Sequence, residues 1–273
     1  MTVHNLSATT FDEIVDCFLE SFENYFVQMP TDQEYYKQRW NAAKVDFELS
    51  YGMFENGELI GFIIHAIDKR NGILTAFNTG TGVLPNYRGK KIVNTIYDYA
   101  IKDLAENGIE KCTLEVITQN KFAIKSYEKT GFKITKTLKC FNGTIEVENN
   151  DEVKLTKVEL DQVNWEDLPN QEFYSWDNQK ESLINSQLNF YKVLYKEKAE
   201  SYFIINSENG YLAQLDLLEN SDNAWERLFS RIKQISATVK FNNVDEQLTE
   251  KIRQLKKVGL INTIDQYEME LDI

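Results

Sequence analysis

A short cationic turn is the part of the sequence best suited to bind an anion. Residues 84–91 read Leu-Pro-Asn-Tyr-Arg-Gly-Lys-Lys, so Arg88, Lys90 and Lys91 place three positive charges within four residues. An apolar run precedes the turn, and an amphipathic run begins after it at Ile92. Because a helix N-terminus presents unpaired backbone N–H groups and a partial positive charge, the turn and the helix start together favour a phosphate ligand. A solvated basic turn without a ligand is the alternative.

A second string of residues lies downstream and contains a candidate proton donor. Its members are spaced as Asn-x-x-Ala-x-x-x-Tyr-x-x-x-Gly-Phe and comprise Asn120, Ala123, Tyr127, Gly131 and Phe132. A phenol held beside a leaving group can donate a proton to it. The alternative for Tyr127 is a half-buried ring that packs under a sheet.

Three carboxylates and one histidine are candidate proton acceptors. Glu115, Asp46 and Glu48 lie near predicted strands and could relay a proton through water, although solvation at the surface is the favoured interpretation for each. His65 lies within an apolar run, where a packing role is favoured over a base. His4 is the other histidine of the sequence, so a histidine-rich metal site is excluded.

The elements that would position these residues follow from hydrophobic periodicity and turn signals. Thr10 is expected to cap a first helix, and an Asn56-Gly57 turn is expected to join two antiparallel strands. The predicted strands are 51–54, 59–68, 73–83, 112–117 and 132–141, and the predicted helices are 11–19, 32–43, 92–105 and 121–130. Gly131 is expected to end the last of these helices.

Composition restricts the class of protein. The chain has 273 residues, of which 42% are hydrophobic, and this excludes wholesale disorder. A net charge of −13 repels phosphate backbones and anionic lipids, so neither nucleic acid nor a membrane is expected as a partner. Three widely spaced cysteines favour a reducing compartment. No export signal or apolar run of membrane-spanning length is visible, so we expect a cytoplasmic protein.

At these residues the sequence resembles the GCN5-related N-acetyltransferase (GNAT) family, over roughly residues 1–145. The family's two motifs have the form V-x-P-x-x-R-G-x-G-x-G and N-x-x-A-x-x-x-Y-x-x-x-G-F. The resemblance implies an α/β GNAT fold, in which a mixed, mostly antiparallel central sheet is flanked by helices. It also implies acetyl-CoA as co-substrate, with no metal.

By the same resemblance, particular residues take particular roles. Main-chain amides of the loop and helix start would hold the CoA pyrophosphate, and the backbone at Val83 and Leu84 would pair with the pantetheine arm and polarise the thioester carbonyl. Asn120 would touch pantetheine, and Tyr127 would protonate the departing thiolate. The pyrophosphate-binding residues would be Arg88, Gly89, Lys90, Lys91, Ile92 and Val93. Lys91 and Val93 depart from the family pattern, which usually has glycines there.

The second half of the chain reads as a degenerate GNAT-like repeat. We expect a catalytic domain at 1–148 and the repeat at 149–273, joined by the polar linker 147–154. The Asn209-Gly210 turn and the run 211–218 echo Asn56-Gly57 and 59–67. Acidic residues such as Glu219 and Asp222 replace the cationic turn, so no CoA is expected in this half.

The segment 155–200 is rich in aromatic residues, for which core packing is favoured over an acceptor pocket. The function expected from all these features is N-acetyl transfer from acetyl-CoA to a primary amine, with acidity favouring a cationic acceptor. Two alternatives are a CoA-responsive regulatory protein without turnover and an enzyme that uses a longer acyl donor. A monomer or a homodimer is expected.

Overall fold

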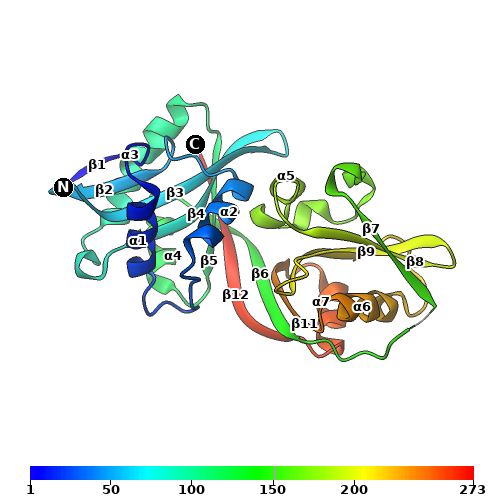
Figure 1. Cartoon of the computed structure of the whole chain (residues 1–273). Coiled ribbons are helices and arrows are strands. Elements are labelled where there is room, and N and C mark those ends of the chain that lie inside the picture. Colours follow the sequence, from blue (N-terminus) through cyan, green and yellow to red (C-terminus); the bar gives the residue numbers. More distant parts are fainter. Residues whose placement is uncertain (151) are drawn as a thin grey trace. The chain divides into compact units, whose positions relative to one another are not determined.

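The structure, a computed structural model, describes residues 1–150 and 152–273 and divides into two compact units (Figure 1). The first unit comprises Met1–Thr135 and Tyr267–Ile273, and the second comprises Lys136–Gln266. The division therefore falls within strand β6 (Lys133–Thr144) and strand β12 (Ile261–Asp272), and not at the expected boundary of 148/149. A continuous strand carries no shift in composition, so the sequence gives no signal there. The expected linker 147–154 lies in the second unit, and its residue 151 is outside the described residues.

The first unit is a mixed sheet in the order β1-β2-β3-β4-β5-β12. Neighbouring strands from β1 to β4 are antiparallel, whereas β4 and β5 are parallel. The strands are β1 (Thr2–Asn5), β2 (Tyr51–Glu55), β3 (Glu58–Arg70), β4 (Ile73–Val83) and β5 (Lys111–Ile117). The helices are α1 (Phe11–Ser21), α2 (Gln33–Ala43), α3 (Ile92–Glu106) and α4 (Lys121–Thr130).

Local signals in the sequence define the ends of these elements. The Thr10 side chain accepts a hydrogen bond from the Glu13 amide while the Glu13 carboxylate accepts one from the Thr10 amide, so the expected cap of α1 is confirmed as a capping box. Asn56 and Gly57 both have positive φ, as a tight hairpin turn requires, and Gly131 ends α4 at φ 115°.

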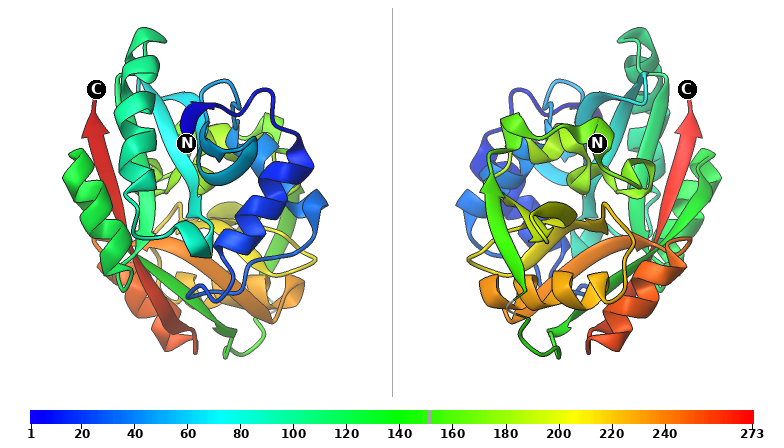
Figure 2. Two further views of the ribbon diagram at one scale, coloured as in Figure 1. Left: turned by 90° about the vertical axis from the view of Figure 1, so that its left-hand side faces the viewer. Right: turned by 90° about the vertical axis from the view of Figure 1, so that its right-hand side faces the viewer.

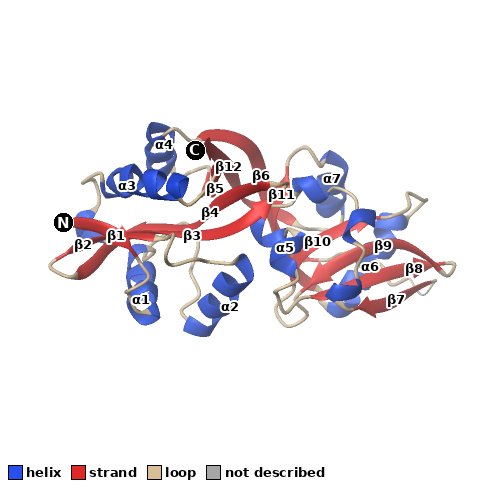
Figure 3. Cartoon of the chain, turned by 90° about the horizontal axis from the view of Figure 1, so that it is seen from above, coloured by secondary structure: helices blue, strands red, loops and turns tan. Residues whose placement is uncertain are grey.

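Helices cover both faces of the first sheet. Figure 3 shows α1 and α2 on one face of these strands and α3 and α4 on the other, and Figure 2 shows α1 and α3 on opposite sides. Alternation along β3 supplies both cores, because Ile63 packs with the core under α3 whereas Phe62 and Ile64 pack with the core under α1. The helices on its two faces therefore bury both sides of this sheet.

The second unit repeats this plan in the order β6-β11-β10-β9-β8-β7. Its other strands are β7 (Val153–Val158), β8 (Asn189–Tyr195), β9 (Lys198–Ile205), β10 (Tyr211–Leu217) and β11 (Thr238–Asp245). Its helices are α5 (Lys180–Leu183), α6 (Ala224–Ile235) and α7 (Thr249–Lys257). Trp165, Tyr174, Trp176 and Phe190 are all buried, which confirms core packing for the aromatic segment.

The internal repeat is real, but its expected register is wrong by one hairpin. Strand β10 is antiparallel to β9 and parallel to β11, as β4 is to β3 and β5. The run 211–217 therefore corresponds to β4 and not to 59–67, and the Asn209-Gly210 turn corresponds to Asn71-Gly72. Both hairpins of the first unit contain an Asn-Gly turn, so the sequence alone did not distinguish them. None of the described helices is long and apolar enough to cross a membrane.

Candidate functional site

The first unit contains an opening between β4 and β5. Their parallel register covers Thr75–Asn78 against Lys111–Leu114, yet the strands continue to Val83 and Ile117. A register shift against β3, which falls between Asn78 and Gly80, bulges β4 at the point where the pairing with β5 stops. Beyond the bulge, β4 is therefore no longer paired with β5.

Two glycines allow close packing beside the opening. A Cβ atom at Gly80 would lie 2.9 Å from the Phe18 ring, and one at Gly82 would lie 2.5 Å from the Phe62 ring. Larger residues at either position would displace the aromatic core that holds α1 against the sheet. In the sequence, the bulge in β4 is indicated only by the two glycines, Gly80 and Gly82, near the end of the strand.

A buried polar cluster lies at the bulge. Asn78 Nδ2 donates to Thr81 Oγ1 at 2.7 Å and to Tyr97 Oη at 2.7 Å, while Asn78 Oδ1 accepts from the Gly80 amide at 3.1 Å. Asn78, Thr81 and Tyr97 were not singled out by sequence reasoning, because an asparagine inside an apolar strand has no distinctive spacing. The cluster fixes the backbone of the bulge.

Tyr127 of α4 joins this cluster. Its side chain is 7% exposed, and its ring packs against Tyr97 at 6.2 Å and Phe132 at 5.9 Å. Burial raises the pKa of the Tyr127 phenol to about 12, and hydrogen bonds with Thr81 and Asn78 act in the opposite direction. The phenol therefore remains protonated at neutral pH, as a proton donor must.

The cationic turn is folded back on α1. Pro85–Tyr87 forms a short 3₁₀ turn, after which the Arg88 guanidinium donates to Ser21 O at 2.9 Å and to Val83 O at 3.3 Å. Lys90 Nζ lies 4.5 Å from the centre of the Tyr87 ring. The Leu84 amide donates to Ile60 O at 3.0 Å, which closes the end of the β3–β4 pair. Arg88 thus orders the turn and leaves two lysines at its surface.

The start of α3 differs at the two positions where the family motif has glycines. Lys91 is the N-cap and has φ 60° and ψ 22°, so a lysine adopts the left-handed conformation that favours glycine. Val93 lies inside the first helical turn and needs no such freedom. Gly89 has φ 78° with no atom within 4 Å of a Cβ placed there. Lys90 and Lys91 are exposed beside the unpaired amides of the first turn.

Asn120 acts as the N-cap of α4. Its Oδ1 accepts from the Ala123 amide at 3.2 Å. A hydrogen bond with Asn120 lowers the pKa of Tyr25, although burial raises it more. Tyr25 lies in the loop between α1 and α2 and packs between Phe22 and Phe26. Sequence reasoning missed Tyr25, since the loop has no periodicity to draw attention to it.

Glu115 lies on the other face of β5 from Tyr127. Cys112, Leu114 and Val116 pack in the same core as Tyr127, and side chains alternate along a strand, so half-buried Glu115 projects from the opposite face. A group held in the opening would have the phenol on one side and this carboxylate on the other.

The remaining candidates have structural roles. Asp46 Oδ1 accepts from the amides of Glu48 and Leu49, at 2.8 and 3.4 Å, and thereby orders a turn. Glu48 is exposed. His65 is completely buried and its Nδ1 hydrogen bonds with Leu49 O at 2.8 Å, which confirms the packing interpretation. Burial lowers the pKa of His65 to about 4, against the effect of that hydrogen bond.

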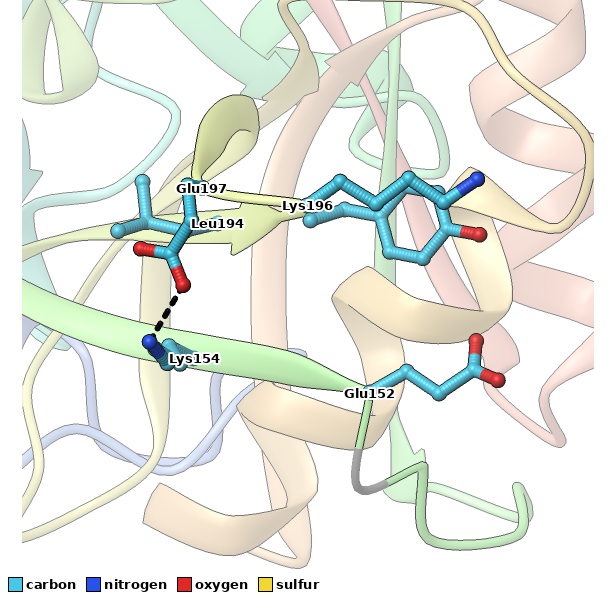
Figure 4. A pocket seen from close by; sticks show the side chains of 6 residues that line it. Glu152, Lys154, Leu194, Lys196 and Glu197 are labelled. Atoms are coloured by element: carbon cyan, nitrogen blue, oxygen red, sulfur yellow. Dashed lines mark hydrogen bonds and ion pairs between the residues drawn. The ribbon is translucent and has the colours of Figure 1, made fainter.

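A surface cavity of about 270 Å³ lies elsewhere, in the second unit (Figure 4). Its lining includes the exposed ion pair between Lys154 and Glu197, whose Nζ and Oε1 atoms are 2.5 Å apart. Four of its six lining residues are charged, and Leu194 and Tyr195 complete the lining around a hairpin turn. Over the described part of the chain, no group of His, Cys, Asp and Glu side chains is arranged to hold a metal ion.

Comparisons with known proteins place this geometry in a class. Residues 11–132 match the model of the Acetyltransferase (GNAT) family. The whole chain is similar in fold to a tandem GNAT protein from the clavulanic acid biosynthesis pathway, with a TM-score of 0.70, 12% identity and coverage of 99% of this chain and 98% of that chain. A putative acetyltransferase from Pyrococcus horikoshii gives a TM-score of 0.69 at 12% identity, covering 100% of this chain and 89% of that chain. The fold is therefore that of two tandem GNAT units.

Two curated proteins match about a third of the chain in sequence. The chain is 34% identical over 90 residues to spermidine N(1)-acetyltransferase of Thermoplasma acidophilum and 30% identical over 91 residues to an N-alpha-acetyltransferase of Arabidopsis thaliana. Each alignment covers 33% of this chain, and 53% and 48% of the two relatives, so the chain spans about half the length of the curated relatives it matches. Residues 11–132 are thus similar to the GNAT acetyltransferase family, and the whole chain has the fold of a tandem GNAT protein.

Proposed function

We propose that the first unit binds acetyl-CoA and transfers its acetyl group to a primary amine by direct attack in a ternary complex. The observation that carries the proposal is the opening between β4 and β5, which has the amino end of α3 beyond Val83 and the buried Tyr127 phenol beside its bulge. A donor with a charged diphosphate and an extended arm has a binding feature at each of these points.

The residues present fit such a donor. Backbone amides from Gly89 to Val93 would hold the pyrophosphate with help from exposed Lys90 and Lys91, because α3 starts there with unpaired N–H groups. The Arg88 amide already donates to Pro85 O at 3.3 Å, so Arg88 would act through the turn that it orders. Backbone groups around Val83 would pair with the pantetheine arm, whereas the Leu84 amide and carbonyl are already bonded to Ile60 O and the Tyr87 amide. Asn120 would contact the arm through its side-chain Nδ2 group, one hydrogen of which serves Tyr25.

Glu115 and Tyr127 divide the proton transfers between the two faces of the sheet. The amine nitrogen would attack the thioester carbon, the carbon–sulfur bond would break, and Glu115 would take the surplus ammonium proton through water. Because the Tyr127 pKa of about 12 is above that of an ordinary thiol, about 8.5, Tyr127 would stabilise the departing thiolate by donating a hydrogen bond. Glu115 would release its proton to water and the free thiolate would take one up from water, so the net products are the amide and the CoA thiol.

The acceptor that fits best is a cationic amine. The net charge of −13 attracts positively charged molecules and raises their rate of encounter. One matched relative is named for spermidine, a polyamine, and the other for N-alpha-acetylation. We therefore place polyamines and peptide amines first among candidate acceptors.

The test measures thiol release from acetyl-CoA by the full chain. Spermidine, a peptide with a free α-amine and a peptide with only a lysine amine should be compared, and we expect release in proportion to protein with at least one of them. Calorimetric titration with acetyl-CoA should give one site per chain. Arg88→Ala should weaken this binding at least tenfold, because the turn loses its tie to Ser21, whereas Lys102→Ala, an exposed cation about 15 Å along α3, should not.

Three other results would change the proposal. Saturable binding without release for any amine would favour the alternative of a CoA-responsive regulatory protein. Faster release with propionyl-CoA or succinyl-CoA would favour a longer acyl donor. Absence of binding at millimolar acetyl-CoA would contradict both the enzyme and the CoA-responsive protein.

A further inference from the structure

The second unit has an opening that corresponds to the one in the first. Strands β10 and β11 are parallel and are paired at Tyr211 with Lys240 and at Leu212 with Phe241, although the strands continue to Leu217 and Asp245. A register shift between Leu212 and Gln214 bulges β10 at this point. Strands β4 and β5 separate after a bulge in the same manner, so the two openings are equivalent in topology.

A segment of the chain itself fills the second opening. Tyr174 Oη donates to Leu215 O of β10 at 3.1 Å, and Asn178 Nδ2 donates to Asn242 O of β11 at 3.4 Å. Gln214 Nε2 donates to Asn178 O at 2.7 Å. The segment Asn170–Asn178 therefore contacts both separated strands, through their backbone as well as their side chains.

A buried ion pair holds this segment in place. Lys251 Nζ of α7 lies 2.8 Å from Asp216 Oδ2 of β10 and 3.1 Å from Tyr174 Oη. Asn170 Nδ2 donates to the same Asp216 oxygen at 2.8 Å. Lys251 and Asp216 are 3% and 7% exposed in this pair, so withdrawal of the segment would leave buried charges with fewer partners.

The anion-binding end of the second opening is also occupied from within. The Leu218 amide donates to Glu200 O at 2.8 Å just as the Leu84 amide donates to Ile60 O, which makes Glu200 the counterpart of Ile60. The Glu200 carboxylate accepts from Arg227 at 2.6 and 2.8 Å and from Ser221 at 2.5 Å. The guanidinium at the start of α6 is therefore paired inside the protein and is not available to a phosphate.

We propose that residues Asn170–Asn178 are a built-in occupant of the second opening, which closes the second unit to acyl-CoA and limits the chain to one donor site. The comparison with a CoA site rests on the proposed function of the first unit, whereas the closure of the opening does not. The segment takes the place of a ligand arm between the strands, and Glu200 supplies the anion at the helix end. The second unit then has a structural role, and Asn170–Asn178 remains in the opening between β10 and β11 under native conditions.

Hydrogen exchange of the full chain, with and without acetyl-CoA, tests the closure. We expect backbone amides of 171–179 to exchange as slowly as those of β9 and β10, and acetyl-CoA at saturation to change their exchange less than twofold. Fast exchange in the unliganded chain would overturn the proposal, and so would a change on addition of acetyl-CoA or a second stoichiometric site in calorimetry.

A pair of variants separates closure from general stability. Asn178→Ala removes the bonds to Asn242 O and Tyr211, and should raise exchange of 171–179 at least tenfold while leaving thiol release by the first unit within twofold. Asn185→Ala, in which only an exposed bond to Glu181 O is lost, should change neither. If Asn178→Ala does not fold, Tyr174→Phe, which keeps the ring, should give the same local increase. If neither variant increases the exchange of 171–179, the proposal is overturned. If the wild-type chain does not bind acetyl-CoA, only the proposed function of the first unit is contradicted.

Discussion

Lys111 of β5 and Glu270 of β12 form an ion pair of 2.7 Å, although 159 residues separate them in the chain. The amide of Ile273 also donates to Glu110 O at 2.9 Å, and Met269 is completely buried in the core that contains Tyr127. The last residues of the chain therefore complete the sheet of the first unit, which holds the proposed donor site.

Met269→Ala tests this contribution. Removal of a completely buried methionine should lower the free energy of unfolding of the first unit by about 2–4 kcal/mol. The change can be measured by urea unfolding followed through loss of acetyl-CoA binding. Ile261→Ala, on the same strand but at a side chain that is 67% exposed, should cost less than about 0.5 kcal/mol. Equal effects of the two substitutions would show that 267–273 does not belong to the first unit.

Tyr127→Phe tests the role of the phenol. The variant keeps the ring contacts but removes the proton donor, so turnover should fall by roughly 10²-fold while the affinity for acetyl-CoA changes less than threefold. Tyr99→Phe, on an exposed tyrosine of α3, is the matched control and should retain full turnover. Undiminished thiol release by Tyr127→Phe would exclude Tyr127 as the group that stabilises the thiolate.

Substitution of Lys91 separates backbone strain from charge. Both Lys91→Gly and Lys91→Ala remove the cation, but only glycine adopts φ 60° without steric cost. We expect Lys91→Gly to be more stable than Lys91→Ala by about 1 kcal/mol in chemical denaturation. The two variants should bind acetyl-CoA with similar affinity if the role of Lys91 is electrostatic. A glycine variant no more stable than the alanine variant would contradict the left-handed cap.

His65 should make the stability of the first unit depend on pH. Its pKa is about 4 in the folded chain and 6.5 when unperturbed. Between these two pH values the unfolded state therefore binds a proton at His65 and the folded state does not. Stability is fully present above pH 6.5 and is lost as pH falls toward 4, by about 3 kcal/mol. His65→Phe should flatten this part of the curve of unfolding free energy against pH.

Glu200→Gln tests the internal anion of the second unit. Loss of the carboxylate leaves the buried Arg227 guanidinium without its charge partner, at a cost of about 3–5 kcal/mol. Thermal unfolding should show the loss, whereas Glu250→Gln, whose partner Arg253 is exposed, should cost less than about 1 kcal/mol. A Glu200→Gln variant as stable as the wild type would mean that the ion pair of Glu200 and Arg227 contributes little to the stability of the second unit.

The ends of helices and the positions of turns could be predicted from the sequence, because interactions between residues close together in the chain determine them. The cap at Thr10, the turn at Asn56-Gly57, the extent of β4 and the glycine stop after Tyr127's helix each depend on residues within one or two turns of each other. The cationic turn before α3 and the spacing that ends at Phe132 likewise sufficed to suggest the family. The buried packing of His65 followed from its apolar neighbours.

The tertiary structure decided the relations that depend on distant residues. The assignment of 267–273 to the first unit, the register of the repeat and the filling of the second opening by Asn170–Asn178 all arise from strand pairing and buried hydrogen bonds across long separations. The cluster of Asn78, Thr81 and Tyr127 exists because β4 bulges where its pairing with β5 ends. The sequence shows which segments can form strands. It does not show which strands pair, because many strands could bond to the same backbone groups and only the assembled sheet fixes the partners and their register.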